Sequence, residues 1–73
     1  MPLFRFTLVE FIAGHGDVPD ELTSTVQYVY SHTADDIISA FDGGTSYMYA
    51  DVSDLVQVDS LPADVTPLSL VES

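Results

Sequence analysis

The hydrophobic positions of the chain change their period between residues 23 and 44, and this change predicts a strand followed by a helix. Residues 25–31 alternate between two sides, which is the pattern of a strand with one buried face. One side carries Val26, Tyr28 and Tyr30, and the other carries Thr25, Gln27, Val29 and Ser31. The next apolar residues repeat at i, i+3, i+4 and i+7, which predicts one apolar stripe on a helix: Ala34, Ile37, Ile38 and Phe41.

Both ends of this helix carry sequence signals. Thr33 has a side chain suited to a helix cap, and Asp36 follows it by three residues, as in a capping box. Asp35 and Asp36 also lie at the positive end of the helix dipole. Gly43 and Gly44 are expected to end the helix, because glycine is a poor helix former and is common just after a helix.

A long first strand is predicted for residues 3–13. A bulge near Val9 and Glu10 is predicted there, because Glu10 interrupts an apolar face and one extra residue exchanges the two faces of a strand. The residues of the interrupted face are Phe4, Phe6, Leu8 and Ile12. Residues 14–21 are rich in Gly, Pro and acids and predict a loop, so the first two strands are expected to form an antiparallel hairpin.

The region after the helix leaves two alternatives open. Residues 45–50 alternate, residues 51–54 interrupt the pattern, and residues 55–60 resume it. One kinked strand and two strands around a turn both fit, because Asp-Val-Ser-Asp suits a bulge as well as a turn. Two prolines near the end exclude a regular helix, so residues 62–73 form either an edge segment or a loose tail.

Together these elements predict a single α+β domain over residues 1–73. The expected order is strand, strand, helix and one or two further strands, in a small antiparallel or mixed sheet of three to four strands with the helix packed on one face. A chain of 73 residues is near the lower size limit for a stable core, and one helix covers only one face of such a sheet. A homodimer through the open sheet face, or a partner over that face, is therefore expected.

The charge balance indicates which classes of partner are compatible with the chain. Twelve acidic residues stand against one Arg and no Lys, which gives a formal net charge of -11. Such a chain repels phosphates, so direct binding to nucleic acid or to an anionic membrane is disfavoured, and a basic protein is the complementary partner. The absence of cysteine excludes disulfides and thiolate metal sites. With no membrane-spanning segment and no signal-peptide layout, we expect a cytoplasmic protein, in the host cytoplasm if the chain is viral.

No catalytic motif accompanies the predicted fold. His15 and His32 are the side chains that titrate near neutrality, but no GxSxG segment positions a serine nucleophile. Asp17 near His15, or Asp42 beside a Gly pair, could supply metal ligands, but the spacing of a calcium loop or of a zinc-binding histidine pair is absent. We therefore expect a non-enzymatic protein with no cofactor and no metal.

Four tyrosines lie in the two alternating segments, as Tyr28 and Tyr30 in one and Tyr47 and Tyr49 in the other. If these segments are neighbours, the rings form a cross-strand aromatic ladder. The rings then either fill a small core with their hydroxyls at its edge or, on an uncovered face, form a contact surface.

The acids are spread through the chain rather than gathered in a tail, and most of them are Asp. Carboxylates on alternate strand residues lie roughly 6.5 to 7 Å apart, a spacing of the same order as that of successive phosphates. A rigid array of short Asp side chains can therefore occupy a basic groove that holds DNA or RNA. An acidic surface without lysine also suits solubility or adaptation to high salt, and this alternative stays open.

Residues 32–38, His-Thr-Ala-Asp-Asp-Ile-Ile, resemble a stretch of the small phage inhibitors of uracil-DNA glycosylase, which are acidic DNA mimics of similar size. The resemblance implies that acids contact the DNA-binding cleft of an enzyme, and that an apolar pocket receives the residue that the enzyme inserts into DNA. Asp35 and Asp36 match the motif residues, whereas the Glu-Ser-Ile contact motif of that family has only Glu21-Leu22-Thr23 as a counterpart here. The size and acidity also resemble those of phage anti-CRISPR and anti-restriction proteins.

We therefore expect a DNA-mimic inhibitor that occupies the basic site of a nucleic-acid-binding protein, for example a uracil-DNA glycosylase, a CRISPR effector or a restriction enzyme. The alternative is a structural or oligomer-forming accessory protein whose acidic surface serves solubility or salt adaptation. The expected contacts combine acids of the first loop, of the helix start and of the later strand region with two aromatic anchors: Asp17, Asp20, Glu21, Asp35, Asp36, Asp51, Asp54, Tyr47 and Tyr49.

Overall fold

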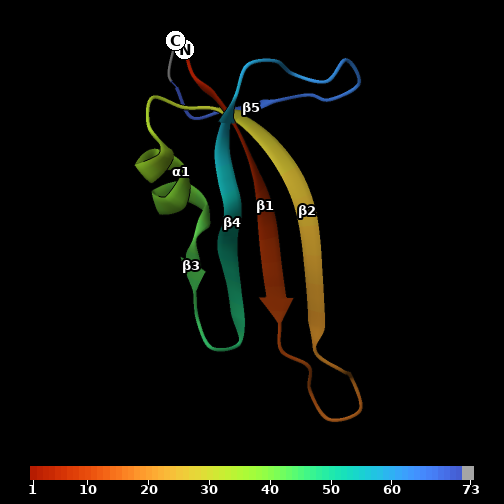
Figure 1. Ribbon diagram of the computed structural model, residues 1–73. Helices are drawn as coiled ribbons and strands as arrows, with labels where there is room; N and C mark the ends of the chain where they lie inside the picture. Colours follow the sequence, from red (N-terminus) through yellow and green to blue (C-terminus); the bar gives the residue numbers. More distant parts are fainter. Residues whose placement is uncertain (72–73) are drawn as a thin grey trace.

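The computed structural model describes residues 1–71, which form one curled five-stranded sheet and one short helix (Figure 1). The strand order is β3-β4-β1-β2-β5, and only β5 runs parallel to its neighbour. The predicted α+β class is confirmed, but there are five strands rather than three or four, because two strands of two residues each complete the edges. The elements are β1 (Leu3–Ile12), β2 (Glu21–Tyr30), α1 (Ala34–Phe41), β3 (Gly43–Gly44), β4 (Met48–Val58) and β5 (Leu68–Ser69).

The predicted hairpin of the first two strands is confirmed. β1 pairs with β2 in one unbroken antiparallel register, from Leu3 opposite Tyr30 to Ile12 opposite Glu21. The connecting loop is closed by the backbone N–H of Gly14, which donates to a carboxylate oxygen of Asp20 at 2.7 Å. We call this end of the sheet the hairpin end, and the opposite end, where β1 begins and α1 lies, the helix end (Figure 1).

The sheet contains one bulge, and it lies on β4 rather than on β1. Arg5 is opposite Val56 and Thr7 is opposite Ser53, so β4 carries one extra residue at this point. Asp54 lies in this bulge and has a left-handed backbone conformation, with φ 55. The bulge predicted near Val9 was therefore wrong, and residues 48–58 form one bulged strand.

The exposure of Glu10 requires no bulge in β1, because helix α1 does not extend over this residue. A helix of 8 residues is about 12 Å long, whereas a strand of 10 residues is about 33 Å long. The helix therefore covers only part of one sheet face. Glu10 lies beyond that part and is exposed on the same face as Phe6.

The core lies between α1 and the sheet near the helix end. Phe4, Phe6 and Val29 pack there with Ile37 of the helix, and Phe6 and Ile37 are almost fully buried. The ring of Phe41 lies against Phe6, with centroids 5.1 Å apart. The alternation predicted for β2 is thus confirmed, and the side that becomes buried is the one that carries Val29.

The predicted cap of the helix is confirmed. The hydroxyl of Thr33 accepts a hydrogen bond from the backbone N–H of Asp36 at 3.2 Å. The segment just before the helix is also held by a hydrogen bond, because the buried hydroxyl of Ser31 donates to the carbonyl oxygen of Thr33 at 2.8 Å. After the helix, Gly43 and Gly44 have φ values of 137 and 128 and continue directly into an edge strand.

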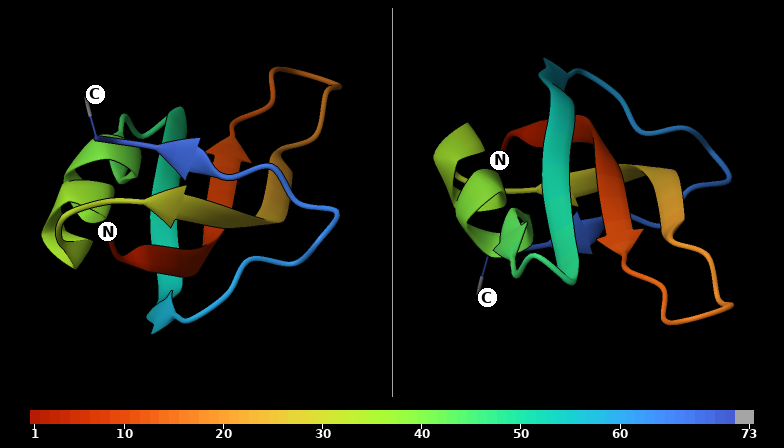
Figure 2. Two further views of the ribbon diagram at one scale, coloured as in Figure 1. Left: turned by 90° about the horizontal axis from the view of Figure 1, so that it is seen from above. Right: turned by 90° about the horizontal axis from the view of Figure 1, so that it is seen from below.

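The last part of the described chain adds an edge segment. Figure 2 shows the segment between β4 and β5 crossing the helix end of the sheet to the outer side of β2. There Leu68 and Ser69 pair with Val29 and Tyr30. Of the two alternatives for residues 62–73, the edge segment thus holds for β5, while residues 72 and 73 lie outside the described residues.

Candidate functional site

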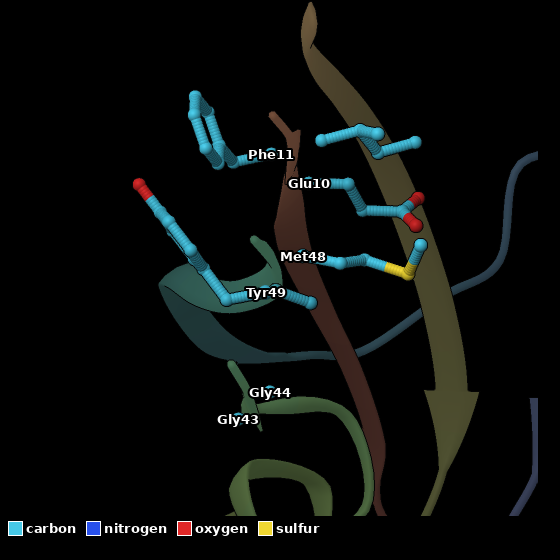
Figure 3. A pocket seen from close by; sticks show the side chains of 8 residues that line it. Glu10, Phe11, Gly43, Gly44, Met48 and Tyr49 are labelled. Atoms are coloured by element: carbon cyan, nitrogen blue, oxygen red, sulfur yellow. The ribbon is translucent and has the colours of Figure 1, made fainter. Parts of the chain in front are cut away.

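The sheet face that points away from α1 carries a row of apolar side chains at the hairpin end. Phe11 of β1 lies opposite Leu22 of β2 on one side and opposite Tyr49 of β4 on the other. The rings of Phe11 and Tyr49 are stacked, with centroids 5.1 Å apart and an interplanar angle of 23°. Figure 3 shows both rings on one side of the strands, while Glu10 and Met48 point to the other side. We call the face that carries these rings the open face.

Further apolar residues extend this row along the open face. Val26 is 57% exposed and Leu22 is 66% exposed, although both belong to a regular strand. Together with Val56 they enlarge the row into a patch, which we call the apolar strip: Val9, Phe11, Leu22, Val26, Tyr49 and Val56. A group of apolar residues that are exposed or half-buried on one face of a small domain marks a candidate interaction surface.

The predicted tyrosine ladder does not form, because β2 and β4 lie on opposite sides of β1. Tyr28 and Tyr30 are instead opposite Arg5 and Leu3, and they are half-buried. The alternative that the tyrosines fill the core is also wrong, since the core consists of two Phe, one Val and one Ile. Tyr47 is 73% exposed in the turn before β4, so only Tyr49 of the two expected anchors belongs to the apolar strip.

The acids expected to form one charged surface lie in three places. Asp17, Asp20 and Glu21 are at the hairpin end, whereas Asp35 and Asp36 begin the helix near the other end (Figure 1). The molecule measures 46 Å along its longest axis, and these two groups lie toward opposite ends of it.

The third group of acids, on β4, belongs to the open face. Asp51 is opposite Val9, and Asp54 lines a shallow cavity of about 680 Å³ together with Arg5 and Val56. Glu21, in contrast, is opposite Ile12 and therefore belongs to the face of Phe6. The alternate-residue array of carboxylates considered from the sequence is not present among these residues, and the acids are distributed over both faces of the sheet.

A second cavity lies where β3 meets β4, at the hairpin end (Figure 3). It has a volume of about 260 Å³, which is smaller than a typical pocket for a cofactor or drug-sized ligand. Gly44 is required in its wall, because a Cβ atom at this position would collide with the carbonyl oxygen of Met48 and with Cα of Tyr49. Glu10 is its one charged residue, and the complete lining is Glu10, Phe11, Ile12, Gly43, Gly44, Met48, Tyr49 and Ala50.

The histidines do not extend either cavity. His15 is exposed in the hairpin loop, and His32 is exposed just before the helix. Within residues 1–71, no three His, Asp or Glu side chains gather closely enough to hold a metal ion. The open face carries apolar side chains with Asp51 and Asp54 beside them, so it offers apolar contact and negative charge.

Comparison with known proteins gives no relative. No protein-family model, no curated protein and no solved structure matches the chain. In the described part of the chain, no helix has the length and apolar character needed to cross a membrane.

Proposed function

We propose that this chain is a non-enzymatic acidic inhibitor that occupies the basic nucleic-acid-binding site of a target protein. The observation that carries the proposal is the combination of a net charge of -11 with Asp51 and Asp54 beside the exposed apolar strip on the open face. Asp51 and Asp54 face the cationic groups of the target, and Tyr49 with Phe11 provides the aromatic anchor.

The two parts of this surface have different physical tasks. Apolar and aromatic groups at the centre of an interface supply most of the affinity when they are desolvated. Charges at the rim mainly raise the association rate and select a partner of opposite charge. The acids at the two ends of the molecule add to the negative field without touching the target, so the proposal does not require a continuous acidic ridge.

The small cavity where β3 meets β4 supports a second contact, and four of its residues belong to the sheet face opposite the open face: Glu10, Ile12, Met48 and Ala50. Its lining is apolar apart from Glu10, and its volume of about 260 Å³ suits a single inserted side chain. The resemblance to glycosylase inhibitors implies a pocket for the apolar residue that the enzyme normally inserts into DNA. We propose that this cavity receives such a residue of the target.

The test is an inhibition assay against three enzymes that bind DNA through basic clefts: a uracil-DNA glycosylase, a CRISPR effector nuclease and a restriction enzyme. We expect that at least one of the three enzymes is inhibited and that DNA competes with the inhibitor. Inhibition should weaken as NaCl is raised, because salt screens the attraction between the acids of this chain and the basic groups of the enzyme. If none of the three is inhibited at micromolar concentrations in low salt, the proposal for these targets is wrong and the accessory-protein alternative is favoured.

Matched variants then locate the surface. The double variant Asp51→Asn with Asp54→Asn removes two charges from the open face. Asn, like Asp, readily adopts the left-handed backbone conformation that residue 54 has. The control Asp59→Asn with Asp64→Asn removes two charges from the exposed segment between β4 and β5. We expect the inhibition constant to rise by about tenfold in the first case and by about twofold in the second. Equal losses would assign the effect to net charge alone.

A further inference from the structure

The outer edge of β2 is unpaired over most of its length. Of the 10 residues of this strand, only Val29 and Tyr30 pair with β5. Residues 21–26 are all exposed, and no other described element runs beside this part of β2 (Figure 1). A row of free backbone donors and acceptors therefore faces solvent at the hairpin end of the sheet.

The hydrogen bonds at the top of β2 identify which backbone groups point outward. The carbonyl oxygen of Tyr30 accepts from the N–H of Leu70 at 2.9 Å, on the side of β5. The N–H of Ser31 donates to the carbonyl oxygen of Pro2 at 3.2 Å, on the side of β1. Because peptide groups alternate along a strand, the outward groups below Tyr30 belong to every second residue. These residues are Leu22, Ser24, Val26 and Tyr28, and of these Leu22, Ser24 and Val26 lie clear of the part of β2 that pairs with β5.

This edge lacks the features with which proteins usually protect an edge strand. Natural edges are short, bulged, charged, or interrupted by proline. Residues 22–30 contain no charged residue and no proline, and their register with β1 is unbroken. The outermost strands of the sheet are protected in this way, since β3 and β5 have only two residues each. The long neutral edge of β2 is therefore the exception in a chain with a net charge of -11.

We infer that β2 pairs with β2 of a second copy of this chain, edge to edge and antiparallel, to form one continuous sheet. One register joins the outward groups that lie clear of β5, with Leu22 opposite Val26 of the second copy and Ser24 opposite Ser24 of the second copy. The two-fold axis passes between the two Ser24 residues, and the contact is isologous. This pairing uses the edge of the sheet, and the open face remains available to a target.

The charge distribution along β2 favours a second copy of the chain as the partner of this edge. Leu22 to Tyr30 is a neutral surface that two copies can share without bringing acids together. In the antiparallel arrangement, Glu21 of each copy lies opposite Gln27 of the other, so the two acidic hairpin loops lie at opposite ends of the contact. The remaining repulsion between the two copies acts over longer distances, and salt screens it beyond about 8 Å at physiological ionic strength. The dimer is therefore expected to strengthen with added NaCl.

This salt dependence has the opposite sign to that of the proposed function. Binding to a basic target weakens as salt rises, whereas self-association of two acidic chains strengthens. Sedimentation equilibrium of the full chain between 20 mM and 500 mM NaCl therefore tests the dimer separately from the target. A dimer that forms more readily at high salt is the expected result. A monomer at millimolar concentration and high salt would overturn the inference and leave the proposed function untouched.

Substitutions at the two-fold axis locate the contact. Ser24→Glu and Ser24→Lys each place two like charges opposite one another, so both are expected to raise the dimer dissociation constant by about tenfold or more. The matched controls are Ser60→Glu and Ser60→Lys, in the exposed segment after β4. If only net charge matters, both Lys variants should dimerise more tightly than the wild type. That outcome would contradict pairing through Ser24.

Backbone amide exchange provides a readout that does not depend on any variant. In the dimer, the N–H groups of Leu22, Ser24 and Val26 become hydrogen-bonded, and their exchange should slow as protein concentration rises. The N–H groups of Thr23, Thr25 and Gln27 point to β1 in the monomer and should change little. Dimerisation without selective protection of the first set would show that the copies meet elsewhere, and the inference would be wrong.

Discussion

The ring of Phe6 in the middle strand lies 5.1 Å from the ring of Phe41 in the last turn of the helix, at an interplanar angle of 47°. This tilted contact holds the end of α1 against the sheet, and Ile37 fills the space one turn earlier. The fully buried apolar side chains of the described chain are few, and they all lie near this contact. Stability should therefore depend strongly on the residues of this one cluster.

Two adjacent isoleucines of the helix test this dependence. Ile37 is 0% exposed and Ile38 is 41% exposed, although they differ by only one position. Ile37→Ala is expected to lower the free energy of unfolding by about 3 kcal/mol, because it removes a core side chain and leaves a cavity. Ile38→Ala is expected to lower it by less than about 1 kcal/mol. Urea unfolding of both variants, followed by circular dichroism, gives the comparison. Similar losses would mean that the helix packs with a different face.

The cap of the same helix gives a smaller effect. Thr33→Ala removes the hydroxyl that accepts the N–H of Asp36, and it should lower the free energy of unfolding by about 1 kcal/mol. Thr33→Ser keeps the hydroxyl and should behave like the wild type. Thermal unfolding of the two variants measures the difference. An equal loss in the Ser variant would point to the methyl group rather than to the hydrogen bond.

Local signals were sufficient to predict the helix. Its cap, its apolar stripe and the glycines after it all act within a few residues, and each has the predicted location. The alternation of the strands was equally local, so the β1–β2 hairpin could be predicted. The position of β4 could not, because it depends on which edge of β1 is free once β2 has paired. The prediction of a tyrosine ladder was wrong for this reason.

The candidate site shows the same limit more clearly. Tyr49 was expected as an anchor from its residue type, but its partner Phe11 is 38 positions earlier in the chain and no local pattern links them. The acids can be located in the sequence, but their grouping in space depends on the register of the sheet. Only the bulge at Asp54 explains why this residue lines the open face near Arg5.

The backbone of that bulge provides a further test. Asp54 has φ 55, a left-handed conformation that glycine adopts more easily than any residue with a Cβ atom. Asp54→Gly is expected to raise the free energy of unfolding by about 1 kcal/mol, and Asp54→Val to lower it by about 1 to 2 kcal/mol. Urea unfolding of the two variants measures this opposite pair of effects. Stabilisation by Val would show that the residue is not left-handed in solution.

The net charge of the chain makes a prediction about the folded state itself. Eleven uncompensated negative charges on 73 residues repel one another more strongly in the compact chain than in the unfolded chain. Salt screens this repulsion, so the melting temperature should rise when NaCl is increased from 20 mM to 500 mM. The control Asp59→Asn with Asp64→Asn removes two negative charges and should melt higher than the wild type at low salt, with a smaller rise on adding salt. The scans are best run at micromolar protein, where association between copies contributes little. If the melting temperature does not change with salt, self-repulsion is not a significant term, and the acids cost the fold nothing even without a cationic partner.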